Sequence, residues 1–140
     1  MIIRFDRTSF TVAVFLLFVL VLLATFGAQL GWIRSWAGDV LATIWLYFVF
    51  KSVIEARPAY LVLLALGFGL GVELAQYLTV YFNISISNRL LRIVFGATPD
   101  WWDVLAYAVG ASIAWIAEIL FSTENPDKNI SSPHGTVDQS

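Results

Sequence analysis

Three carboxylates and one amide stand in or beside apolar stretches of this sequence, and their types suit acid–base chemistry or binding of a charged group. Asp39, Glu73 with Gln76, and Asp103 each lie within or at the edge of a run long enough to cross a bilayer. A charge at the bilayer centre costs about 2.5–3.5 kcal/mol even on insertion scales, so such residues face partners, water or a site. The sequence therefore predicts a polar site inside a membrane domain.

Glu73 and Gln76 are three residues apart, so they share one face of a helix. A carboxylate in apolar surroundings needs a nearby cation, or else it takes up a proton. Arg34, Arg89 and Arg92 are the basic residues expected on the same side of the membrane. Two interpretations stay open: a structural Glu–Arg pair that fixes a loop onto the bundle, or a group used in catalysis, proton relay or binding.

Asp39 and Asp103 each come at the start of an expected helix. An aspartate there caps free N–H groups and interacts favourably with the helix dipole. Capping is one interpretation of each residue, and a site shared with Glu73 is the other. From Asp103 a stripe of residues continues along one helix face at spacings of four, three and four, through Tyr107, Gly110 and Ala114.

Several chemistries are disfavoured by the residues that the chain lacks. It has no cysteine and one histidine, His134, in a polar tail, so thiol catalysis and histidine-based zinc sites are not expected. Carboxylate oxygens suit Mg²⁺ or Ca²⁺, but no DxD-like motif or P-loop is present, so we assign no metal ligands and expect no cofactor. The net charge of −2 gives no basic field for nucleic acid.

The composition indicates that these residues sit on membrane helices. The chain is 59% hydrophobic and 13% charged, whereas soluble domains carry roughly 25% charged residues. A helix needs ~20 residues to span ~30 Å of hydrocarbon. Four runs meet this length, at residues 10–28, 37–54, 59–79 and 102–121. We expect an all-α polytopic membrane protein, with a four-helix transmembrane domain over residues 1–121 and a disordered polar tail over residues 122–140.

The basic residues favour an orientation with both termini in the cytoplasm. Five of them fall on the side of the two termini and three on the other. This orientation places the carboxylates near the outer face. Between the third and fourth runs, residues 89–95 mix two arginines with apolar side chains, which predicts a short amphipathic segment on that face.

Two further patterns concern packing. Gly67, Gly71 and Ala75 are spaced by four and predict a smooth ridge that another helix can approach closely. Glu118 lies near the inner end of the fourth run, where we expect a structural pair with Arg4, Arg7 or Lys51.

Four short motifs in order resemble the bacterial family known as domain of unknown function 2809, which looks related to the VanZ-like membrane proteins. They are GDVL at 38–41, ELAQ at 73–76, RIVFG at 92–96 and WDVLAYAVG at 102–110. VanZ-like proteins show a comparable Glu-x-x-Gln, a later basic residue and an Asp leading the last span. The resemblance therefore implies a location in the bacterial inner membrane and points to Asp39, Glu73, Gln76, Arg92 and Asp103, with Arg34 and Arg89 beside them. VanZ-like proteins are linked to resistance to the antibiotic teicoplanin. In those proteins an Asn follows the Asp of the last span, and no such Asn follows Asp103 here, so we do not assign that resistance to this chain.

Three functions fit these residues. The first is a cell-envelope component whose carboxylate and arginine pocket binds an amphiphile or a lipid-linked precursor. The second is a membrane-embedded enzyme acting on a lipid-linked or envelope substrate, with Glu73 as acid or base and Asp39 and Asp103 orienting the substrate. The third is a small proton-coupled transporter subunit, which requires an oligomer because four spans without a repeat form no path alone. The oligomeric state is left open.

Overall fold

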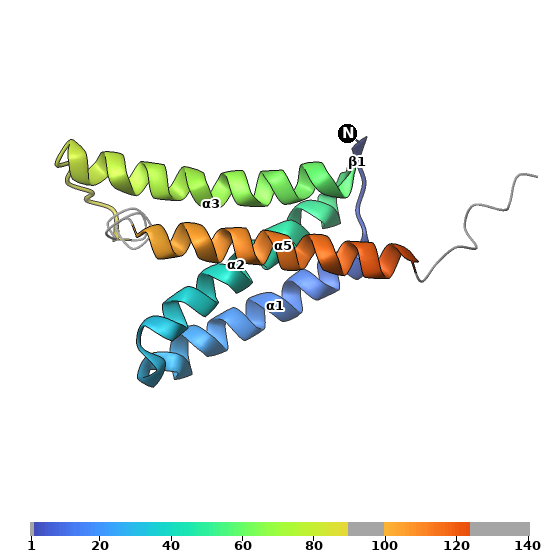
Figure 1. The fold of residues 1–140 in the computed structure, drawn as a ribbon, viewed down its shortest axis with the longest axis horizontal. Helices are drawn as coiled ribbons and strands as arrows, with labels where there is room; N and C mark the ends of the chain where they lie inside the picture. The colour runs from blue at the N-terminus through green and yellow to red at the C-terminus, as the bar shows by residue number, and fades with distance from the viewer. Residues whose placement is uncertain (1, 90–99, 124–140) are drawn as a thin grey trace, which may run out of the picture.

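The computed structural model of the 140-residue chain describes residues 2–89 and 100–123. Four α-helices dominate the described part: α1 (Arg7–Phe26), α2 (Trp32–Val53), α3 (Pro58–Tyr81) and α5 (Trp101–Thr123). The smaller elements are the 3₁₀ helix η1 (Gly27–Leu30) and two short strands, β1 (Ile2–Ile3) and β2 (Ile54–Glu55). α3 and α5 run side by side, while α1 lies along α2, which crosses α5 (Figure 1). The predicted all-α class is confirmed.

Three helices are long and apolar enough to cross a membrane: α1, α3 and the part of α5 from Trp101 to Phe121. α2 has 22 residues, about 33 Å at 1.5 Å per residue, but it does not reach the same apolarity. The helix contains the charged residues Arg34, Asp39 and Lys51, and it packs against α1, α3 and α5. A fourth span at α2 therefore stays a prediction.

Two other expectations fall mainly on residues that the structure leaves undescribed. Of the amphipathic segment 89–95, only Arg89 is described, and it is exposed. Of the polar tail 122–140, Ser122 and Thr123 are described and continue α5 by two residues beyond the expected run. The rest of both segments lies outside the described residues.

The N-terminus of α1 is fixed by a side-chain cap. The Asp6 carboxylate accepts hydrogen bonds from the backbone N–H of Thr8 and Ser9, each at 3.2 Å, and from the Ser9 hydroxyl. These bonds satisfy N–H groups that have no partner inside the helix. The hydrogen bond from the Ser9 hydroxyl has the largest effect and lowers the pKa of Asp6 below its ordinary 3.8. Burial raises this pKa, and the backbone N–H groups of Ser9 and Thr8 lower it further.

α2 begins earlier than the apolar pattern predicts. Its first residue is Trp32 rather than Ala37, and it follows Gly31, whose φ of 55° lies in the left-handed region that favours glycine. Asp39 is consequently two turns inside the helix. The prediction that Asp39 caps a helix start is therefore wrong, because the free N–H groups belong to the first turn only.

Close helix contacts occur at two glycines. A Cβ atom at Gly110 would lie 2.6 Å from the carbonyl oxygen of Val40 and 2.8 Å from Cβ of Thr43, so α5 touches the backbone of α2 there. A Cβ atom at Gly69 would lie 2.9 Å from the ring of Tyr107. These two positions hold α5 against α2 and α3.

The predicted ridge of Gly67, Gly71 and Ala75 is not the contact surface within the described chain. An added Cβ atom at Gly67 or Gly71 meets no described atom within 4 Å. Gly69, between them in sequence, faces α5 instead. The spacing of the small residues predicts a close contact on this helix, but it does not determine which face of α3 turns toward the other helices.

β1 and β2 form a two-residue antiparallel pair that joins the N-terminus to the end of α2. Ile2 lies opposite Glu55 and Ile3 opposite Ile54. Further backbone bonds run from the N–H of Arg4 to the carbonyl of Val53 and from the N–H of Asp6 to that of Ser52. This attachment carries the chain directly into the cap of α1.

We expect Gly110→Ala to destabilise the protein by about 1–3 kcal/mol, because the added methyl group must displace the backbone of α2. Gly67→Ala is the matched control, since its methyl group meets open space, and it should leave stability unchanged or slightly raised. Unfolding of the two purified variants in detergent by increasing SDS measures both effects. Equal behaviour of the two variants would contradict the close α2–α5 contact.

We expect Asp6→Ala to lower stability at neutral pH by about 1 kcal/mol, through loss of the cap. The lowered pKa of Asp6 sets the pH dependence. Its contribution is present above 3.8 and is lost as the pH falls through the still lower pKa of the folded protein. Unfolding of wild type and variant measured from neutral pH down to pH 2 should therefore converge at the acid end. A constant difference over that range would show that the carboxylate is not the stabilising group.

Candidate functional site

Glu73 lies where α3 meets the beginning of α5, and its side chain is held at both oxygens. The Tyr107 hydroxyl donates to Oε1 at 3.3 Å, and the backbone N–H of Asp100 donates to Oε2 at 3.2 Å. Glu73 is 8% exposed, and Gln76, one turn further along the same face, is 7% exposed. The predicted shared face of these two residues is therefore the buried face of α3.

Asp100 organises the beginning of α5. Its Oδ1 accepts a hydrogen bond from the N–H of Trp102 at 3.0 Å, and its carbonyl accepts one from the N–H of Asp103 at 3.1 Å. Because its own N–H donates a hydrogen bond to Glu73, Asp100 connects α3 to the N-terminus of α5. The partial positive charge of that terminus also favours a carboxylate beside it.

Tyr107 stands among the three carboxylates that the sequence singles out. Its ring lies over Gly69 of α3, where a Cβ atom would clash with the ring, and its hydroxyl reaches Glu73. Asp39, Glu73 and Asp103 are all close enough to act on it electrostatically. The expected stripe along α5 is confirmed, since Tyr107, Gly110 and Ala114 are buried and Asp103 is partly buried.

Asp39 and Asp103 face each other across the α2–α5 contact. Their carboxyl groups lie close enough to interact electrostatically. Asp39 Oδ2 is buried, and it has no hydrogen-bond partner among the described residues. Two carboxyl groups in contact repel when both are ionised, so the pair is stabilised by a proton or another cation.

Two of the three predicted arginines, Arg34 and Arg89, make no described ion pair with the carboxylates. Arg34 donates from Nη1 to the carbonyl oxygen of Ala24 at 3.2 Å, and its stem packs on Gly27 at the end of α1. Arg89 is exposed and forms no ion pair with a described carboxylate. Arg92 lies outside the described residues. Within the described part of the chain, neutral donors take the place of the expected counter-ions at Glu73.

Two surface hollows open beside the carboxylates, and both include Asp100. The first, of about 460 Å³, is lined by Trp32, Ser35, Trp36, Asp100, Trp102 and Asp103. The second, of about 390 Å³, is lined by Glu73, Leu74, Tyr77, Asp100, Trp101 and Val104. Both hollows are therefore lined by carboxylates together with aromatic rings. Exposed tryptophans and tyrosines at one end of a bundle are also typical of a membrane interface.

Over residues 2–89 and 100–123, no group of three or more Asp, Glu or His side chains converges as metal ligands would. The cluster instead offers a carboxyl pair, a tyrosine-bound glutamate and aromatic walls. This arrangement suits a positively charged organic group, because aromatic faces and carboxylates both attract cations.

Sequence reasoning missed Asp100, Gly69 and Trp36 as parts of this region. Asp100 carried a signal, because an aspartate directly before an apolar run is typical of a helix cap. Gly69 and Trp36 carried none, since their roles depend on how α3 and α2 are rotated about their axes.

Comparison with known proteins identifies a family match over most of the predicted helical region. The family model described as "Protein of unknown function (DUF2809)" matches residues 28–111, more than half of the chain. The comparison with curated proteins and the comparison with solved structures gave no match. The matched residues include all of those that line the carboxylate cluster.

We expect Asp39→Asn to raise the stability of the protein, because the amide can donate a hydrogen bond to Asp103 where a repelling oxygen now lies. Glu55→Gln is the control, since it changes an exposed carboxylate at the other end of the bundle. Thermal unfolding in detergent at neutral pH measures both. A loss of stability in Asp39→Asn greater than in the control would contradict direct contact of the two carboxyl groups.

Proposed function

Since this chain belongs to the DUF2809 family of proteins of unknown function and has helices suited to a membrane, we propose that it binds an amphiphile. The polar head of this amphiphile carries a positively charged ammonium group. The observation that carries the proposal is the Asp39–Asp103 carboxyl pair, which has no basic partner among the described residues.

The charge of the site supports a cationic ligand. Asp39, Glu73, Asp100 and Asp103 gather where α2, α3 and α5 meet. Glu73 has its hydrogen bonds filled by neutral donors, which satisfy the oxygens without cancelling the charge. A cation entering beside Asp100 and Asp103 would relieve the repulsion within the cluster, so its binding is favoured by the charges already present.

The walls of the first hollow support an ammonium group rather than a small inorganic ion. Trp32, Trp36 and Trp102 line it together with the two aspartates. A tryptophan face attracts an ammonium group by about 0.5–2 kcal/mol, and cages of aromatic side chains with carboxylates suit methylated ammonium groups. An alkyl chain attached to the head would then extend along the apolar outer surface of the helices.

The position of the site within the fold supports an amphiphile over a soluble cation. The cluster lies at the ends of α3 and α5, which are both apolar enough to span a membrane, and tryptophans surround it. A head at the interface and a chain in the hydrocarbon match this setting. The proposal retains the bacterial inner membrane, with cytoplasmic termini and this site at the envelope side.

The enzyme alternative, with Glu73 as acid or base, finds less support. Both oxygens of Glu73 are engaged, by Tyr107 and by the N–H of Asp100. An acid or base must reach the proton that it transfers, so this geometry favours a structural and electrostatic role for Glu73. A proton-coupled transporter subunit would use the Asp39–Asp103 pair, and it would need an oligomer, because four helices without a repeat form no path alone.

Binding of decyltrimethylammonium to the purified protein in a neutral maltoside detergent tests the proposal, with tryptophan fluorescence as the readout. We expect it to bind about tenfold more tightly than decyl sulfate, which has the same chain and the opposite charge. Asp103→Asn should weaken binding of the ammonium compound about tenfold, because one attracting charge is removed.

Glu55→Gln is the matched control, because Glu55 is an exposed carboxylate outside both hollows. It should leave binding unchanged. Equal or tighter binding of decyl sulfate would overturn the proposal and favour an anionic head, as the sequence-based arginine pocket implies. Unchanged binding in Asp103→Asn would show that the ammonium compound binds elsewhere.

A further inference from the structure

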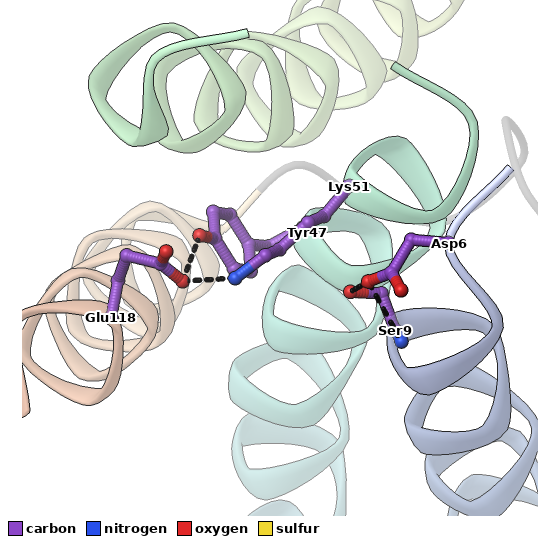
Figure 2. Close-up of polar contacts among 5 residues, drawn as sticks. All are labelled: Asp6, Ser9, Tyr47, Lys51 and Glu118. Atoms are coloured by element: carbon purple, nitrogen blue, oxygen red, sulfur yellow. Dashed lines mark hydrogen bonds and ion pairs between the residues drawn. The ribbon is translucent and has the colours of Figure 1, made fainter. Parts of the chain in front are cut away.

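A second polar cluster lies at the opposite end of the bundle, where α2 ends and α5 approaches its C-terminus. The Tyr47 hydroxyl donates to Glu118 Oε2 at 2.8 Å, and Lys51 Nζ forms an ion pair with the same oxygen (Figure 2). Lys51 Nζ also lies 5.9 Å from the centroid of the Tyr47 ring. The expected pairing of Glu118 with Lys51 is therefore present.

This cluster forms one wall of a hollow of about 300 Å³. The hollow is lined by two basic residues, Arg4 and Lys51, and by three acidic residues, Asp6, Glu55 and Glu118. Apolar side chains complete it, among them Phe5, Ile54 and Leu61. None of its lining residues belongs to the carboxylate cluster at the other end.

The charged groups retain hydrogen-bonding capacity toward the hollow. Glu118 receives both of its bonds at Oε2, and Oε1 has no partner among the described residues. Lys51 has three N–H donors and uses one in the described structure, with 29% of its side chain exposed. Arg4 and Glu55 pair at 3.5 Å near the rim. Donors and acceptors of opposite charge thus stand a few ångströms apart.

We propose that this hollow binds the phosphoethanolamine headgroup of a phospholipid. The phosphate lies against Lys51 and Arg4, and the primary ammonium lies against Glu118 and Glu55. A headgroup carrying both charges matches walls that carry both signs, whereas an anionic headgroup alone meets three carboxylates. The apolar residues receive the start of the acyl chains. This inference goes beyond the proposed function, because it involves a separate site.

A primary ammonium is favoured over a quaternary one by the character of the walls. Glu118 Oε1 and the Glu55 carboxylate are hydrogen-bond acceptors, and a primary ammonium donates three N–H bonds. A trimethylated ammonium donates none and relies on aromatic faces. Of the described aromatic residues that line the hollow, Tyr47 is 1% exposed with Lys51 already beside it, which leaves the ring of Phe5 alone and no aromatic cage.

Native mass spectrometry of the full chain tests the proposal. The protein is released from vesicles that contain equal amounts of phosphatidylethanolamine, phosphatidylcholine and phosphatidylglycerol. We expect phosphatidylethanolamine to be retained about tenfold over the other two lipids. Preferential retention of either other lipid, or equal retention of all three, would overturn the proposal.

The double variant Lys51→Met/Glu118→Met removes both charges together, so neither is left buried without its partner. It should abolish the preference. Arg57→Gln is the control, because Arg57 is exposed near this end and does not line the hollow, and it should keep the preference. A preference that survives in the double variant would also overturn the proposal.

Two further experiments complete the test: a variant of the rim and competition by a free headgroup. Arg4→Gln/Glu55→Gln alters only the exposed rim, so it should fold even where the double methionine variant does not, and it should reduce the preference two- to threefold or more. Free O-phosphoethanolamine distinguishes a lipid from a soluble ligand. Displacement of the lipid by an equal concentration of the free compound would show that the site takes a soluble ligand, against the proposal.

Discussion

A carboxylate within a membrane-spanning helix has to find its hydrogen bonds inside the protein, and Glu73 finds them at the beginning of α5. The hydroxyl of Tyr107 comes from α5 and the N–H of Asp100 from the residue directly before it, so a single side chain of α3 helps to fix both the position and the rotation of α5. Gly69 permits this contact because it leaves room for the Tyr107 ring. The hydrogen bonds of Glu73 therefore depend on the close packing of α3 and α5 at Gly69.

The position of α2 brings Asp39 close to the acidic residues of α3 and α5. Because it begins at Trp32, Asp39 lies inside the helix and meets Asp103 at the crossing with α5. The same crossing requires Gly110, where α5 approaches the backbone of α2. α2 also buries Thr43, Tyr47 and Ser52 against its neighbours. Its polar side chains therefore have protein neighbours within the bundle.

Much of the architecture follows from the sequence, because long apolar runs have few structures available to them in a membrane. The buried face of α5 and the pairing of Glu118 were also predictable from spacing and charge. The start of α2 was not, since Arg34 and Ser35 interrupt its apolar pattern. Nor was the choice of Gly69 over Gly67 and Gly71, because helix rotation is set by partners distant in sequence. The partner of Glu73 was missed for the same reason.

The carboxylates at the two ends of the bundle differ in whether a basic side chain neutralises them. Glu118 receives an ammonium from Lys51, so its charge is neutralised by the protein. Glu73, Asp39 and Asp103 have neutral donors or one another, and no basic side chain among the described residues neutralises them. Uncompensated charge next to hydrocarbon raises the free energy of the empty site, and a cationic ligand removes that cost. This difference is the reason that we propose a cation at the first end and a headgroup carrying both charges at the second.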